Sequence, residues 1–202
     1  MKYKQNHSNG QKILALLIFA SISMYACSST GLTRKQREAM EHYVDHTADA
    51  IHLSTKKVKQ LLSDYKSQHG TWPSDDKDRR IIFNKISEVL REHNISGKKL
   101  LEVDKSEVIV EYSLSESAYR QFPQLLESWV IIFSNGQNKD LDIVSIYPHW
   151  CDSKEMSAKS PYSASQVESL RSRFQQLLQE KLTTYSLTLN DHFGESRGSG
   201  VE

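Results

Sequence analysis

Apolar residues recur with a helical period in the stretch from Thr33 to about Gln68, which contains no proline or glycine. The apolar and small positions alternate spacings of four and three residues, as in a helix that packs along one face. They are Met40, Val44, Thr47, Ile51, Ser54, Val58, Leu61 and Tyr65. Because Thr47 and Ser54 weaken a self-standing coiled coil, we expect a helix that packs on its own domain. Gly70 and Pro73 mark its end.

A second amphipathic helix is predicted from about Lys77 to His93. Ser74 and the aspartates after it supply a cap and an acidic first turn. The residues expected on its buried face are Ile82, Phe83, Ile86, Val89 and Leu90.

After this helix the spacing of the apolar residues changes from the helical period to a period of two residues. Residues 108–114 alternate as a half-buried strand does, with a short strand at 100–103 ahead of it. Residues 129–133 and 141–147 flank Asn135-Gly136, which predicts a hairpin. Both of these strands carry apolar residues on both faces, so we expect them to be central or covered by helices.

The last part of the chain predicts a covering helix. Residues 148–161 have the composition of a polar loop, and Ser165 with Glu168 matches a capping box that opens a helix. Its expected buried stripe is Val167, Leu170, Phe174, Leu177, Leu178 and Leu182. Tyr185, Leu187 and Leu189 alternate as an edge strand would. The predicted class is therefore α+β: a long N-terminal helix, a second helix, an antiparallel sheet of three or four strands, and a C-terminal covering helix.

An apolar run, Ile13–Ala26, precedes these elements. Its 14 residues are fewer than the roughly 20 that a membrane-spanning helix needs. Lys2, Lys4 and Lys12 stand before it, and the small residue Ala26 ends it. A positive leader, a short apolar segment and a small residue before the cut are typical of a secretory signal peptide.

The residue after this run is Cys27, and Met24-Tyr25-Ala26-Cys27 resembles the lipobox of bacterial lipoprotein precursors. In that family the leader is cut just before the cysteine, which carries a diacylglyceryl thioether, and the new amino terminus is acylated. The resemblance implies that Cys27 is lipidated and anchors the protein in the membrane. Met24 and Tyr25 depart from the leucine and small residue that are usual there. Ordinary cleavage with release, or an uncleaved anchor or core helix, are the alternatives.

The residue after the lipidated cysteine sorts such proteins between membranes. Here it is Ser28 and not the aspartate that retains lipoproteins in the inner membrane. The resemblance therefore implies the periplasmic face of the outer membrane.

Composition limits the function classes. Without residues 1–26 the chain keeps 176 of its 202 residues, with 23 basic and 25 acidic side chains. This length predicts one domain, and a near-neutral charge argues against nucleic-acid binding. Arg34, Lys35 and Arg37 form a small basic cluster that we interpret as a solvated helix start, with contact to lipid headgroups as the alternative. With Cys27 lipidated, Cys151 has no partner in the chain, and we expect it to be buried.

A second resemblance lies at the end of the long helix. Tyr65-Lys66, followed by Gly70-Thr71-Trp72-Pro73, is similar to the segment that closes the long helix of type II secretion pseudopilins. It implies a long helix, a turn, a shorter helix and an antiparallel sheet over residues 33–148. The methylated Phe-Thr-Leu-Ile-Glu start of that family has no match here.

Three groups of residues are candidate chemical sites. Gly194-Glu195-Ser196-Arg197-Gly198 matches a nucleophile elbow but lies in a glycine-rich tail. Glu38, His42, His46 and Asp49 are the better metal candidates, yet the two histidines point away from the apolar stripe and so face solvent or a partner. We expect a solvated face, with adventitious capture of a metal ion as the alternative. His149, Trp150, Cys151 and Asp152 are potential ligands too close in sequence, and we expect the middle two to be buried. The prediction is no catalytic residue, no cofactor and no metal.

The predicted organisation is a signal peptide at 1–26, a lipidated tether at 27–33, one domain at 34–190 and a flexible tail at 191–202. The predicted function is a membrane-anchored periplasmic lipoprotein that binds or scaffolds a protein partner in the envelope without enzymatic activity. The alternatives are a periplasmic hydrolase or metal-binding enzyme, and a pilus or secretion-system accessory protein.

Overall fold

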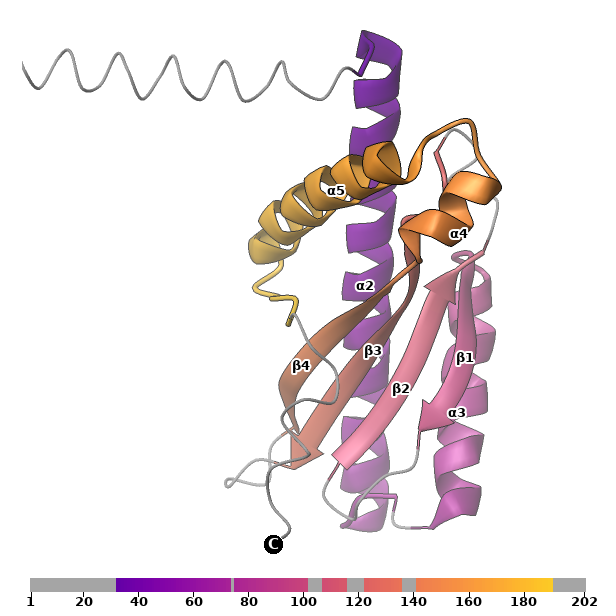
Figure 1. Cartoon of the computed structure of the whole chain (residues 1–202). Coiled ribbons are helices and arrows are strands. Elements are labelled where there is room, and N and C mark those ends of the chain that lie inside the picture. Colours follow the sequence, from indigo (N-terminus) through magenta and orange to yellow (C-terminus); the bar gives the residue numbers. More distant parts are fainter. Residues whose placement is uncertain (1–31, 74, 102–106, 116–121, 136–140, 191–202) are drawn as a thin grey trace, which may run out of the picture. The chain divides into compact units, whose positions relative to one another are not determined.

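The computed structural model describes residues 32–73, 75–101, 107–115, 122–135 and 141–190. The chain divides into two units, Met1–Lys35 and Gln36–Glu202, and the fold below is that of the second. Its described elements are four helices and a four-stranded antiparallel sheet, which confirms the α+β class and its predicted order of elements (Figure 1). Cys27 and residues 194–198 lie outside the described residues. In the described part of the chain, no helix is both long and apolar enough to cross a membrane.

The first described helix, α2, spans Arg34–His69. Gly70 ends it with a left-handed backbone (φ 72°) and donates its N–H to the Lys66 carbonyl at 2.8 Å. The predicted stripe is buried as far as Val58, but Leu62 is buried in place of Leu61. A straight helix has 3.6 residues per turn, so a 3.5-residue repeat drifts off the buried face over several turns. The prediction of Leu61 and Tyr65 as buried positions was therefore wrong.

Helix α3 spans Asp76–Arg91, and the Asp75 carboxylate caps it by accepting from the Asp78 N–H at 2.8 Å. Tyr65 of α2 donates its hydroxyl proton to Asp78, which ties the end of α2 to the start of α3. Most of the expected face is buried, but Val89 is 38% exposed, so its predicted burial was wrong. It lies at the flank of the stripe, where the sheet no longer covers the helix.

The strands are β1 Ile95–Leu101, β2 Glu107–Leu114, β3 Leu126–Asn135 and β4 Leu141–Trp150, paired in the order β1-β2-β3-β4. The first strand begins five residues earlier than the 100–103 strand that the sequence predicted. The predicted polar loop at 148–161 was also wrong. Pro148 pairs with Trp129 inside β4, which is possible because β4 is an edge strand and needs no outward N–H there.

A short helix, α4 (Ser153–Ala158), follows β4, capped by the Asp152 carboxylate. Helix α5 then spans Ala164–Thr184, and its capping box is formed by Ser163 and Gln166 and not by the predicted Ser165 and Glu168. The predicted edge strand after it is reduced to one parallel bridge, Ile146 to Leu189.

Helices α2, α3 and α5 contact one face of the sheet, here called the helix-covered face. Trp129 of β3 donates its indole N–H to Ser54 of α2 at 3.1 Å, and the rings of Phe83 of α3 and Tyr112 of β2 stack at 6.2 Å. Trp129 and Tyr112 are cross-strand partners, so they belong to the same face. The opposite, second face carries a smaller apolar cluster of Ile109, Val130, Ile132 and Tyr147.

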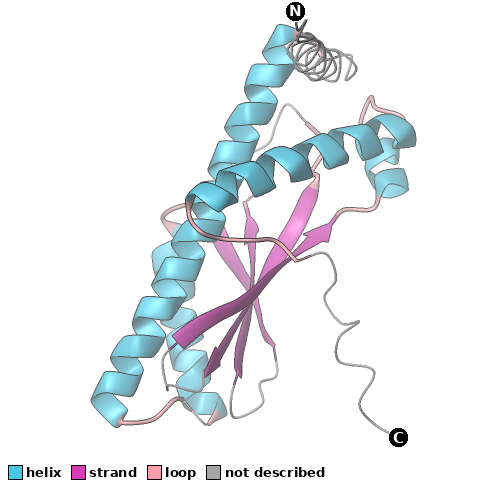
Figure 2. Ribbon diagram, turned by 90° about the vertical axis from the view of Figure 1, so that its left-hand side faces the viewer, coloured by secondary structure: helices cyan, strands magenta, loops and turns pink. Residues whose placement is uncertain are grey.

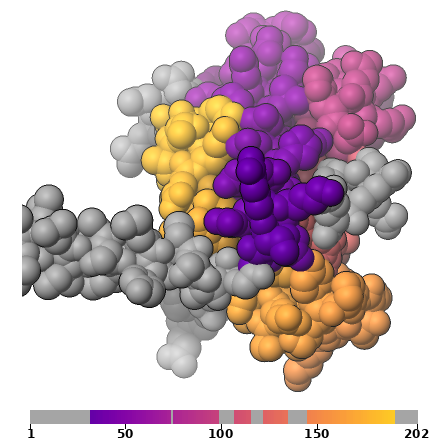
Figure 3. All heavy atoms as spheres, turned by 90° about the horizontal axis from the view of Figure 1, so that it is seen from above, coloured from indigo at the N-terminus to yellow at the C-terminus, as the bar shows by residue number. Residues whose placement is uncertain are grey.

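Helix α5 crosses α2 at an angle (Figure 2). The Phe174 ring lies 4.4 Å from the Tyr43 ring, and Lys181 pairs with Asp45 at 2.8 Å. Figure 3 shows the atoms of α5 directly against those of α2. Phe174 precedes Lys181 in α5, and their partners Tyr43 and Asp45 follow the same order in α2. The two helices therefore cross with their N-to-C directions roughly parallel and not antiparallel.

Gly97 allows α3 to approach β1 closely. A Cβ atom at this position would lie 2.3 Å from Ser87 Oγ and 3.0 Å from Phe83 Cζ. The first distance is shorter than real Cβ contacts and the second is tight, so a larger residue fits only if the side chains of Ser87 and Phe83 shift.

We predict that Gly97→Ala lowers the free energy of unfolding by about 1–3 kcal/mol, because the added methyl overpacks this contact. The Ser87 hydroxyl is buried without a hydrogen-bond partner, so Ser87→Ala alone should cost little and should recover part of the loss in the double variant. Urea denaturation measures all three proteins. Gly70→Ala is the matched control, since it is strained by its φ angle alone and Ser87→Ala cannot rescue it. Equal stability of Gly97→Ala and wild type would contradict the close approach.

Candidate functional site

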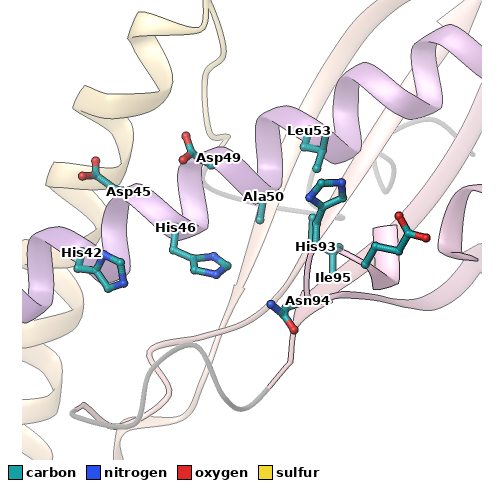
Figure 4. A pocket seen from close by; sticks show the side chains of 10 residues that line it. His42, Asp45, His46, Asp49, Ala50, Leu53, His93, Asn94 and Ile95 are labelled. Atoms are coloured by element: carbon teal, nitrogen blue, oxygen red, sulfur yellow. The ribbon is translucent and has the colours of Figure 1, made fainter. Parts of the chain in front are cut away.

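A cleft of about 450 Å³ lies where α2 passes the turn between α3 and β1 (Figure 4). The residues that line it are His42, Asp45, His46, Asp49, Ala50, Leu53, Glu92, His93, Asn94 and Ile95. Helical spacing brings His42 and His46 to one side of α2, one turn apart. The cleft is therefore built from one continuous helix and one turn that is distant in sequence.

The turn is held in place by its backbone. Asn94 has φ 60°, a left-handed conformation that asparagine tolerates better than most residues. Its carbonyl accepts from the Ser115 N–H at 2.9 Å and from the Ser115 hydroxyl at 3.0 Å. The turn that carries His93 is thus tied to the end of β2.

Asp45 and Asp49 line the cleft but point to another side of α2 than the histidines (Figure 4). Asp45 pairs with Lys181, and this hydrogen bond raises the pKa of Lys181. Asp49 accepts from the Tyr185 hydroxyl, which raises the pKa of Tyr185. The two carboxylates therefore join α2 to α5.

The structure changes the interpretation of the predicted metal candidates. His42 is exposed and His46 is half-buried, and both line the cleft, where the sequence predicted a solvated face. Asp49 is bound to Tyr185, and Glu38 does not line the cleft. Within the described ranges, no three His, Cys, Asp or Glu side chains form a group that could hold a metal ion.

A polar group that the sequence did not predict lies on the second face of the sheet. The buried Ser128 hydroxyl donates to Glu111 Oε1 at 2.5 Å and lies 3.2 Å from His149 Nδ1. His149 Nδ1 is 3.4 Å from the same carboxylate oxygen. Ser128 has an exposed fraction of 0%, so its oxygen is not accessible to a substrate. The only clue in the sequence was a serine at the start of an apolar strand.

Cys151 lies in a different place from His149. It lines a hollow of about 520 Å³ between the end of the sheet and α4, together with Lys98, Glu127 and Glu155 among others. The predicted burial of Cys151 is confirmed, because the residue is 8% exposed, whereas Trp150 is only half-buried. Burial raises the pKa of the Cys151 thiol from 9.0 to about 11, and nearby Glu127 acts in the same direction.

Comparison with models of protein families, with curated proteins and with solved structures finds no match to this chain.

We predict that the Cys151 thiol of the folded protein reacts with iodoacetamide at pH 8 about a hundredfold more slowly than in the unfolded chain, because the thiolate is the reactive form. The measurement uses Cys27→Ser, so that one thiol remains, with and without denaturant. Equal rates in the two states would show that the thiol is neither buried nor shifted in pKa.

Proposed function

We propose that the protein is a non-enzymatic binding or scaffolding component of the bacterial cell envelope. In this proposal it is attached through lipidated Cys27 to the periplasmic face of the outer membrane and holds a protein partner. The N-terminal leader and its lipobox support the address. The arrangement of polar side chains in the domain supports the role.

The observation that carries the proposal is the contrast between the candidate catalytic groups and the cleft. Ser128 is buried against Glu111, and the Cys151 thiol is buried with a raised pKa. His149 lies beside Ser128, and Cys151 lies in the hollow beside α4. The two side chains therefore do not form one catalytic group that would support the hydrolase alternative. The cleft on α2, in contrast, is open, and its His, Asp, Glu and Asn side chains can form polar contacts with a protein partner.

The edges of the sheet are less suited to a partner than this cleft. At the outer edge of β1, a register shift between Gly97 and Lys99 and the exposed Lys98 disfavour the addition of another strand. At the other edge, Pro148 lacks an N–H and Leu189 already bridges to Ile146. We therefore assign the partner contact to the cleft-facing side of α2.

A second candidate is a pilus or secretion-system accessory protein. That function needs a sheet that packs against the second half of the long helix. Ser54 bonds to Trp129 here, and Val58 and Leu62 of α2 lie with Val108 and Val110 of β2 around one small apolar pocket. This packing favours the candidate but does not distinguish it from other α+β domains.

Photocrosslinking in intact cells tests the proposed contact. We expect benzoylphenylalanine at position 42 or 53, both in the cleft, to give the same discrete crosslinked product. The matched control is position 180, which is exposed on α5 and does not line the cleft. Crosslinks of equal yield at 180, or none from the two cleft positions, would contradict the assignment.

A further inference from the structure

We propose that His42 and His46 form a binding site for a divalent transition-metal ion such as Zn²⁺ on the cleft-facing side of α2. This site lies on the surface to which the partner contact is assigned, but the proposal does not rest on that partner. It also revises the expectation from sequence, which treated the two histidines as part of a solvated face.

The geometry of the helix supplies two nitrogen ligands. Side chains four residues apart have Cβ atoms about 5–6 Å from each other, and the two rings lie on the same side of α2 (Figure 4). Zinc binds imidazole nitrogen at about 2.0–2.1 Å, so two ligands of a tetrahedral ion are about 3.3 Å apart. We infer that rotation of the two side chains brings one nitrogen of each ring to this spacing.

The helix itself does not need to be ordered by the metal. Tyr43, Val44 and Thr47, which lie between and beside the two histidines in sequence, are all buried. The backbone of this turn is fixed by packing, so metal binding carries the entropy cost of two side chains and not of a helical turn.

The type of ligand decides which ion the pair can bind. Asp45 and Asp49 point to another side of α2 (Figure 4) and bond to Lys181 and Tyr185, so the histidines supply the ligands. A neutral imidazole is a ligand that zinc, copper and nickel prefer, whereas magnesium and calcium prefer oxygen. The pair therefore selects transition metals.

The ion would have open coordination positions. Because the described residues provide no third ligand close enough, the remaining positions belong to water or to a donor atom of a bound molecule. We therefore expect a weaker and more reversible site than a structural zinc site with four protein ligands.

Titration calorimetry of Zn²⁺ into the untagged full-length protein tests the proposal. We expect one ion per chain, and an affinity that falls about tenfold or more in His42→Ala and in His46→Ala, since each removes one of two ligands. His69→Ala is the matched control. His69 is exposed on the same helix but has Tyr65, and not a histidine, one turn before it, so this variant should bind as wild type does.

Two further measurements keep the result unambiguous. His42→Gln keeps a polar side chain at the exposed position and should show the same loss, while circular dichroism verifies that each variant is folded. A tenfold excess of Mg²⁺ should not displace Zn²⁺. The proposal is overturned by an absence of Zn²⁺ binding, by equal affinity in wild type and both histidine variants, which indicates an adventitious ion only, or by displacement with Mg²⁺, which indicates carboxylate ligands.

Discussion

The hydrogen bond from the Trp129 indole to Ser54 marks the contact on which the rest of the structure depends, the packing of α2 against the sheet. Both residues are buried at an exposed fraction of 0%, and a buried N–H without a partner costs about 1–3 kcal/mol. Ser54 therefore stands inside the apolar stripe because its hydroxyl accepts the indole N–H of Trp129. The same helix also holds Phe174 of α5 through Tyr43, so one buried stripe joins the helices and the sheet.

This arrangement determines where a ligand or partner can bind. One side of α2 is filled by the sheet and another by α5, to which Asp45 and Asp49 are committed. Within the described residues, the side that carries His42 and His46 faces the short turn after α3, and the cleft lies between them (Figure 4). The proposed partner contact and the proposed metal site both follow from this cleft.

Residue periodicity predicted the helices well, because each buries one face: the stripe of α2 from Met40 to Val58 is buried as expected. The half-buried strand predicted at 108–114 was wrong in its burial, because β2 is a central strand and Ile109 and Ser113 on its second face are buried as well. Periodicity failed at Pro148, where it predicted a loop. The residue lies in β4 instead, because an edge strand can contain a proline. The candidate sites were harder to predict. His93 and Asn94 join the cleft from a distant turn, and Glu111, Ser128 and His149 meet only through strand register, which a sequence read locally does not contain.

We propose that lipidated Cys27 attaches this domain to the membrane, and metabolic labelling with radioactive palmitate in the host tests this attachment. We expect label in the wild-type protein and in Cys151→Ser, because the Cys151 thiol is buried, and no label in Cys27→Ser. Equal label in wild type and Cys27→Ser, or no label in either, would contradict attachment through Cys27.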